Sequence, residues 1–145
     1  MNLLDVNVLL ALLWPTHPDF AVADAWFRSH SQETWATCAL TQSGFIRISA
    51  QNSFKHGGRS LDAIAAGLEM ATASVRHRFL TIDFSFKTVG EICTGGVIGH
   101  RQITDAYLLA LAVKSNAKFV TLDTGVRQLL ATEKERASHL TVLEG

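Results

Sequence analysis

The 145-residue sequence has few residues that crosslink or interrupt a chain, with only two cysteines and two prolines. Cys38 and Cys93 lie in apolar surroundings without CxxC spacing, so two buried thiols are favoured over a disulfide or a cysteine metal site. No uncharged apolar run is long enough to span a membrane, and no basic segment precedes the first apolar run as in a secretory signal. These absences predict a cytoplasmic protein.

The chain also lacks net charge, because 13 basic residues balance 13 acidic ones. A neutral chain has no overall attraction to nucleic acid, which disfavours a pure nucleic-acid-binding module but permits an enzyme with a local basic surface. Candidates for that surface are Arg47, Lys55, His56 and Arg59, although a solvated loop or helix end explains each of them more simply. With 48% hydrophobic residues, we expect one well-packed domain over residues 1–145.

Short apolar runs alternate with longer helical patterns along the chain. This alternation is typical of βαβ units and predicts an α/β fold with a parallel sheet. The strands are expected at residues 2–5, 35–38, 79–82, 118–122 and 140–143. The helices are expected at residues 6–13, 17–30, 40–48, 61–74, 103–113 and 126–131, with loops at 49–58 and 94–99.

Three aspartates fall where a strand should end or a helix should begin, namely Asp5, Asp105 and Asp123. Because the carboxyl ends of parallel strands share one edge of a sheet, acids far apart in sequence can meet there. Crowded carboxylates repel one another unless a cation lies between them. Mg²⁺ or Mn²⁺ is the usual cation, with waters and substrate phosphate filling its other positions. The leading hypothesis is a metal-dependent phosphodiesterase.

Each of these acids, taken alone, also has a structural explanation. Asp5 and Asp123 could cap the helices that follow them. Asp105 lies in the first turn of its helix, where the helix dipole favours a carboxylate, and Thr104 is the candidate cap. Asp83 also follows an expected strand, but a strand remote from the switch point would hold its acid too far away. We therefore expect Asp83 to cap the next helix.

Four segments carry a further signal: LLDVNVLL at 3–10, WATCALTQSGFIR at 35–47, GHRQITDAYLLALA at 99–112 and FVTLD at 119–123. In order and spacing they resemble the motifs of PIN-domain ribonucleases, and specifically of VapC-type toxins from bacterial type II toxin–antitoxin pairs. The third segment is the most specific. The resemblance covers essentially the whole chain.

The resemblance implies a three-layer α/β/α sandwich with a central, mainly parallel sheet of about five strands. It also implies Mg²⁺- or Mn²⁺-dependent endoribonuclease activity, a probable homodimer and a cognate antitoxin that blocks the site. By position, Asp5, Asp105 and Asp123 match catalytic, metal-binding acids of the family, the last directly or through water. Asn7 matches a polar residue that supports the first acid.

One position departs from the family pattern. The second segment often carries a glutamate where this chain has Gln42. An amide can bind a metal through its carbonyl or hold a water, but it brings no charge. Gln42 therefore leaves open whether the site holds one metal ion or two.

RNA phosphodiester hydrolysis is the function expected from these features, with tRNA, rRNA or mRNA as the substrate. Attack in line would leave a 5′-phosphate and a 3′-hydroxyl, a polarity that the resemblance implies. Arg47 and Arg101 are candidate RNA-binding residues, and His100 lies beside the second of them. Nothing in the sequence identifies which RNA is cut.

Two other classes of protein compete with this hypothesis. A phosphoacceptor receiver domain needs an acidic pair after the first strand and a lysine after the last, and this chain has neither. A catalytically weak or inactive PIN-like module that binds RNA or a protein partner is the stronger rival. Gln42 favours that module, whereas the three retained aspartates argue against it.

Overall fold

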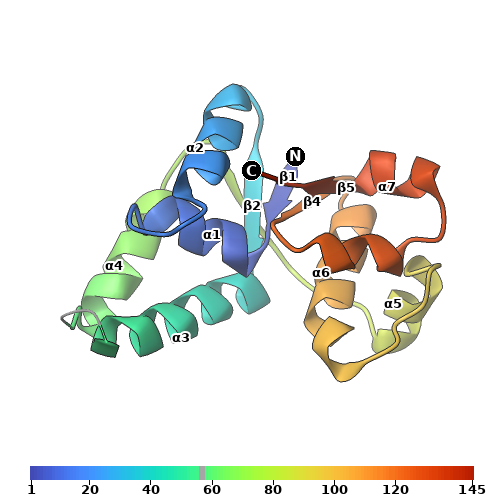
Figure 1. Ribbon diagram of the computed structural model, residues 1–145. Coiled ribbons are helices and arrows are strands. Elements are labelled where there is room, and N and C mark those ends of the chain that lie inside the picture. Colours follow the sequence, from blue (N-terminus) through green and yellow to red (C-terminus); the bar gives the residue numbers. More distant parts are fainter. Residues whose placement is uncertain (56–57) are drawn as a thin grey trace.

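A five-stranded sheet runs through the middle of the molecule (Figure 1). The structure is a computed structural model that describes residues 1–55 and 58–145. The strands are β1 (Asn2–Leu4), β2 (Trp35–Cys38), β3 (His77–Leu80), β4 (Lys118–Thr121) and β5 (Leu140–Val142). Their order across the sheet is β3-β2-β1-β4-β5, and every neighbouring pair is parallel.

Helices cover both faces of this sheet. They are α1 (Val6–Leu13), α2 (Phe20–Ser29), α3 (Ala39–Lys55), α4 (Leu61–Thr72), α5 (Phe86–Ile92), α6 (Ile103–Lys114) and α7 (Glu133–His139), with 3₁₀ turns η1 (His100–Gln102) and η2 (Thr124–Leu129). In Figure 1, α1–α4 gather on one side and α5–α7 on the other. The expected three-layer α/β/α sandwich around a parallel sheet is confirmed. No helix in the described part of the chain is long and apolar enough to cross a membrane.

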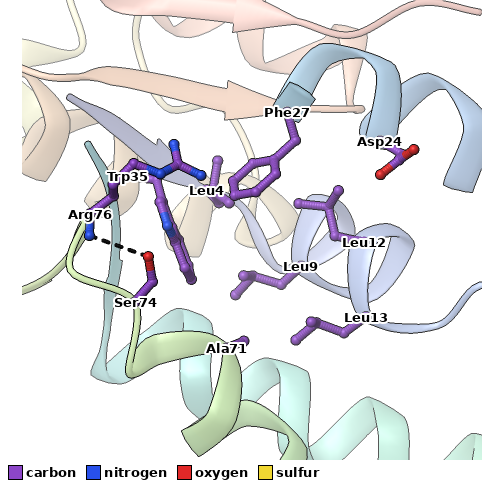
Figure 2. A pocket seen from close by; sticks show the side chains of 10 residues that line it. All are labelled: Leu4, Leu9, Leu12, Leu13, Asp24, Phe27, Trp35, Ala71, Ser74 and Arg76. Carbon is purple, nitrogen blue, oxygen red and sulfur yellow. Dashed lines mark hydrogen bonds between the residues drawn. The ribbon is translucent and has the colours of Figure 1, made fainter. Parts of the chain in front are cut away.

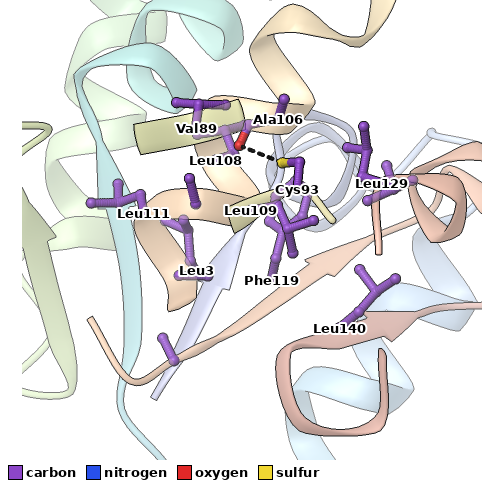
Figure 3. Packing of buried hydrophobic residues seen from close by; sticks show 14 of the residues in the cluster. Leu3, Val89, Cys93, Ala106, Leu108, Leu109, Leu111, Phe119, Leu129 and Leu140 are labelled. Carbon is purple, nitrogen blue, oxygen red and sulfur yellow. Dashed lines mark hydrogen bonds between the residues drawn. The ribbon is translucent and has the colours of Figure 1, made fainter. Parts of the chain in front are cut away.

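Two cores result from the alternation of side chains along the strands. Leu4 packs with α1–α4, in a cluster that includes Leu9 and Trp35 (Figure 2). Leu3 points the other way and packs with Phe119 against α5 and α6 (Figure 3). Successive residues of a strand face opposite sides of the sheet. A central strand covered on both faces therefore has to be apolar at consecutive positions.

The helix α6 is buried on most of its circumference. Its buried residues are Ala106, Leu108, Leu109, Ala110, Leu111 and Ala112. It packs against both β1 and β4. A helix that is apolar nearly all round belongs in the interior, and this position brings the first turn of α6 close to the centre of the sheet.

Both cysteines are buried and free, as the sequence predicted. The thiol of Cys93 lies 3.7 Å from the Ala106 carbonyl oxygen, and burial raises the pKa of this thiol to about 11. A thiol with so high a pKa carries almost no thiolate at neutral pH, and the thiolate is the reactive form. Cys93 therefore serves packing.

Gly44 allows α3 to approach α1 closely. A Cβ added at Gly44 would lie 2.6 Å from the Cγ2 atom of Val6. Val6 has a short, branched side chain in the first turn of α1, so it cannot turn away without strain. The glycine is needed here for space.

Replacing Gly44 with alanine should lower the free energy of unfolding by about 1–3 kcal/mol, because the added methyl overpacks the α1–α3 contact. Gly67→Ala is the matched control, since Gly67 lies in α4 with no heavy atom within 4 Å of an added Cβ. That change should raise the free energy of unfolding by about 0.5–1 kcal/mol through helix propensity. Urea unfolding measures both, and an equal effect at the two glycines would contradict this account of the contact.

The expected loop at residues 49–58 is wrong over its described first part. The helix α3 continues to Lys55, and the buried Ser49 accepts a hydrogen bond from Trp14 Nε1 at 2.9 Å. A polar run without glycine or proline can stay helical when one face packs against the protein. His56 and Gly57 lie outside the described residues, as does the side chain of Lys55.

Strand β3 begins and ends two residues earlier than expected. Its register pairs His77 with Trp35 and Leu80 with Cys38. Asp83 is therefore well past the strand and exposed, and Ser85, not Asp83, occupies the N-cap position of α5. The expected cap by Asp83 is wrong. The expected α-helix at 126–131 is instead the 3₁₀ turn η2.

Candidate active site at the carboxyl edge of β1 and β4

The candidate site lies where β1 and β4 end side by side. Strands β2 and β3 continue the sheet on one side of this pair, and β5 continues it on the other, so the direction of winding reverses here. Ligands in open α/β sheets bind at such a switch point, outside the carboxyl ends of the strands. Asp5 follows β1 directly, and its backbone N–H donates to the Val120 carbonyl of β4 at 2.9 Å.

Asp5 forms the floor of the site and is only 5% exposed. One carboxylate oxygen, Oδ1, accepts a hydrogen bond from the Val6 backbone N–H at 2.7 Å, and Oδ2 accepts from Thr121 Oγ1 at 2.6 Å. Asp5 therefore does cap α1 through its side chain. The cap uses Oδ1, so both interpretations left open by the sequence can hold together.

Burial raises the pKa of Asp5 above its ordinary value. Hydrogen bonds from Thr121, Val6 and Asn7 favour the carboxylate and lower this pKa, but they do not offset the loss of water. The negative charge of Asp123 raises the pKa further. A charged Asp5 is thus costly in this setting without a nearby cation.

Thr121 is the polar centre of the site, and the sequence interpretation did not single it out. Its hydroxyl donates to Asp5 and accepts from Asn7 Nδ2 at 3.2 Å and from the Asp123 backbone N–H at 3.0 Å. Asn7 Oδ1 also accepts from the Leu122 backbone N–H at 3.1 Å. Asn7 therefore lies beside Asp5 and Thr121. The available signal for Thr121 was a hydroxyl at the end of an apolar strand.

Replacing Thr121 with valine should lower the rate of any reaction at this site by about 10–100-fold, as removal of ligand-orienting partners does. Valine has the same shape but leaves Asp5 Oδ2 and the Asn7 amide without the hydroxyl that joins them. Thr121→Ser keeps the hydroxyl and should retain most of the activity. Equal losses in the two variants, measured as initial rates, would exclude a role for the hydroxyl.

Asp105 is the third residue of α6 and is partly buried. Gln102, the last residue of the turn η1, occupies the N-cap position of α6. The expected cap by Thr104 is therefore wrong. Burial raises the pKa of Asp105 to about 7, and the charges of Asp5 and then Asp123 add to the rise. The three aspartates named from the sequence are therefore close enough to repel one another.

Asp123 lies at the exposed mouth of the site. It occupies the N-cap position of η2, and its Oδ1 accepts from the Gly125 backbone N–H at 2.8 Å. Its Oδ2 has no hydrogen-bond partner within the described residues. From Asp5 through Asp105 to Asp123, the carboxylates thus range from buried to open to solvent.

The structure shows no cation of the described residues that balances the charges of this cluster. Among the described residues, no lysine, arginine or histidine forms a salt bridge with Asp5, Asp105 or Asp123. A divalent cation would fit this excess of negative charge. No group of three His, Cys, Asp or Glu side chains in the described ranges is arranged to hold a metal ion by itself. A bound ion would therefore need waters or substrate oxygens, which is how Mg²⁺ is commonly held.

Gln42 makes its hydrogen bond away from the aspartates. Its Nε2 donates to Thr37 Oγ1 at 3.0 Å, and the same hydroxyl lies 2.8 Å from His77 Nε2. Gln42 also lines a groove of about 640 Å³ between α3 and α4, together with Arg47. None of its described contacts joins it to the acid cluster.

The predicted RNA contacts lie on different surfaces. Arg47 is exposed in the α3–α4 groove, where Glu69 also lies. Arg101 is exposed in η1, directly before α6, and Gln102 Oε1 fixes this turn by accepting from the Ile98 backbone N–H at 2.8 Å. Arg59 instead stacks over Trp14, with its guanidinium carbon 4.8 Å from the ring centroid.

Comparison with known proteins identifies the family. The PIN domain family matches residues 3–130. Ribonuclease VapC44 of Mycobacterium tuberculosis is 39% identical over 141 residues, which cover 97% of this chain and 98% of that protein. Ribonuclease VapC39 of the same species is 36% identical over 86% of this chain and 89% of its own length.

Solved structures agree at the level of the fold. VapBC2 from Rickettsia felis, solved with a DNA fragment from its promoter, matches with a TM-score of 0.63 at 15% identity, covering 99% of this chain and 98% of that one. The sarcin–ricin loop cleaving toxin VapC20 of M. tuberculosis matches with a TM-score of 0.61 at 11% identity and full coverage of both chains. The sequence matches show that the chain belongs to the PIN-domain family and, within it, to the VapC ribonucleases.

Proposed function

We propose that this protein is a metal-dependent endoribonuclease and the toxin of a toxin–antitoxin pair. The observation that carries the proposal is the group of carboxylates at the switch point, where burial and then the charges of Asp5 and Asp123 raise the pKa of Asp105 to about 7. Such a group is costly to fold unless it serves a charged ligand. The relatives named as VapC ribonucleases support RNA as the substrate.

Asp5, Asp105 and Asp123 are the proposed catalytic and metal-binding residues. When bound, Mg²⁺ or Mn²⁺ would lower the pKa of a water molecule and offset the charge that develops on the scissile phosphate. The raised pKa values of Asp5 and Asp105 support this assignment, because a cation would relieve the repulsion that causes part of them.

The protein's own groups would orient the acids. Thr121 and the Val6 N–H hold both oxygens of Asp5, so this carboxylate has little freedom to turn. Asn7 fixes the Thr121 hydroxyl from the other side. The pKa of Asp105, about 7 without a cation, would fall when a cation lies beside it, so Asp105 would act as a charged carboxylate at neutral pH. In-line attack would leave a 5′-phosphate and a 3′-hydroxyl.

The substrate would be held by cations outside the acid cluster. Arg101 is the favoured contact, because η1 leads directly into the helix that carries Asp105. Arg47 is the second candidate, on the α3–α4 surface. Each would bind an RNA phosphate and contribute to affinity rather than to base recognition.

We further propose that the chain acts as one domain in the cytoplasm, as a homodimer, and that a cognate antitoxin covers its acids. The match to a VapBC pair solved together supports the antitoxin. The negative cluster at the site would attract a basic side chain of that partner.

Cleavage of bulk tRNA, rRNA and mRNA by the purified protein tests the proposal. We expect cutting with Mg²⁺ or Mn²⁺ and none with EDTA. The rival function, a catalytically weak or inactive module, is favoured by one observation: Gln42 brings no charge and bonds to Thr37. RNA binding without cutting, under every metal condition and on all three substrates, would support that rival and overturn the proposal.

A further inference from the structure

A half-open cavity of about 280 Å³ lies on the α1–α4 side of the sheet (Figure 2). Its walls are mostly apolar: Leu9, Leu12 and Leu13 of α1, Phe27 of α2, Trp35 of β2 and Ala71 of α4. An apolar cavity of ~150 Å³ is large enough to hold benzene. This one has room for an aromatic ring with a short side arm.

Arg76 lies in the cavity wall, and only one of its guanidinium nitrogens donates a hydrogen bond within the described residues. Arg76 Nη1 donates to the backbone carbonyls of Glu33 at 2.8 Å and His30 at 3.4 Å. Its guanidinium lies over the Phe27 ring, 5.2 Å from the centroid. Within the described residues, no carboxylate pairs with Arg76, and its Nε and Nη2 groups make no hydrogen bond. The guanidinium is thus held in place with a donor edge free.

The indole of Trp35, which is 6% exposed, forms the wall beside Arg76. Its Nε1 is buried and has no hydrogen-bond partner in the part of the chain that the structure describes. Because this nitrogen has almost no accessible surface, the indole contributes its apolar ring, and not an open N–H, to the cavity wall.

The remaining charged residue of the lining is already neutralised. Asp24 accepts from Arg28 Nε at 2.7 Å. Figure 2 shows Asp24 and Arg76 on opposite sides of the cavity, with Trp35 beside Arg76. An anion is therefore favoured at the Arg76–Trp35 side, and an apolar body is favoured against α1.

We propose that this cavity is a binding site for a small apolar carboxylic acid in its anionic form. The carboxylate lies against the Arg76 guanidinium, beside the Trp35 ring. The ring or short chain of the ligand lies among the leucines of α1. This site is separate from the acid cluster, so its test does not depend on nuclease activity.

Phenylacetate is the probe for a first test on the full chain, with indole N–H signals followed by ¹H–¹⁵N NMR. Substitutions Trp14→Phe and Trp26→Phe assign the signals and leave Trp35 intact. We expect a saturable shift of the Trp35 signal, while Trp14, bonded to Ser49, stays in place. Phenylacetamide, the neutral counterpart, should bind at least about tenfold more weakly, because it cannot form a charge-assisted pair with Arg76.

Two variants make the test specific. Arg76→Gln should weaken phenylacetate binding about tenfold and leave phenylacetamide binding unchanged. Arg78→Gln is the matched control, because Arg78 is exposed in β3, close to Arg76 in sequence, and donates to the Val75 and His77 carbonyls. It should bind as the wild type does.

Ala71→Leu, which fills the cavity, should abolish binding of both probes. It also keeps the test decisive if Arg76→Gln fails to fold. Three results would overturn the proposal: no saturable Trp35 shift, equal binding of phenylacetate and toluene, or unchanged phenylacetate binding by Ala71→Leu. Equal binding of phenylacetate and toluene would show that the cavity binds apolar molecules whether or not they carry a carboxylate.

Discussion

Replacing Asp5 with asparagine is expected to lower metal-dependent RNA cleavage by about 10³-fold or more, as removal of a central charged group of an active site does. Asparagine has nearly the same shape but brings no negative charge to the floor of the site. Its single carbonyl oxygen also cannot accept from both Val6 and Thr121, as the two oxygens of Asp5 do. Charge and orientation are therefore lost together.

The fold should survive this change. Asp5 is buried with a raised pKa, so removing its charge relieves a desolvation penalty and offsets part of the lost hydrogen bonding. Thermal melting of the variant should accordingly stay close to that of the wild type. Asp83→Asn is the matched control, because Asp83 also follows a strand but is exposed near the far edge of the sheet. RNA cleavage by Asp5→Asn at the wild-type rate, or equal losses of cleavage rate in Asp5→Asn and Asp83→Asn, would be incompatible with the proposed site.

Replacing Asp105 with asparagine should stabilise the metal-free protein at pH 7.5. The pKa of Asp105 is about 7 in the folded protein and about 3.9 in an unfolded chain. Between these values the folded state binds more protons than the unfolded state, so this group makes the free energy of unfolding fall as pH rises from about 4 to about 7. Asparagine does not titrate, so the free energy of unfolding of the variant does not fall in this way as the pH rises.

The size of the effect is limited by solvent. Because Asp105 is only partly buried, we expect about 1–2 kcal/mol, or about 3–6 °C in melting temperature, rather than the full value implied by its pKa. The advantage of the variant should shrink as the pH approaches 4. Adding Mg²⁺ or Mn²⁺ at pH 7.5 should raise the melting temperature of the wild type and leave Asp105→Asn nearly unchanged. Equal melting temperatures of the two metal-free proteins at pH 7.5 would contradict the proposed destabilisation by the charged Asp105 carboxylate.

Much of the fold was predictable because it depends on local patterns. The short apolar run before Asp5 indicated the first strand, and the alternation of strands and helices indicated a parallel sheet. Asp5 and Asp123 could be placed together because strand ends share an edge. The end of α3 could not be predicted, since its polar turns are helical through packing such as the Trp14–Ser49 hydrogen bond.

The supporting residues of the site were harder to predict, because their roles depend on contacts between distant segments. Thr121 meets Asp5 across 116 positions of sequence, and only the pairing of β1 with β4 fixes that contact. The direction of the Gln42 amide depends likewise on Thr37 and His77, which come from two different strands. The raised pKa of Asp105 also follows from burial, which a linear motif does not contain.

Mn²⁺ binding to the purified protein, measured by calorimetry beside the cleavage assay, tests the central claim most directly. The account predicts that Mn²⁺ binds to the wild type and to Asp83→Asn, that Asp5→Asn binds far more weakly, and that the concentration of half-saturation matches that of half-maximal RNA cleavage. Undiminished Mn²⁺ binding by Asp5→Asn, or full cleavage in EDTA, would contradict a metal-dependent site built on Asp5, Asp105 and Asp123.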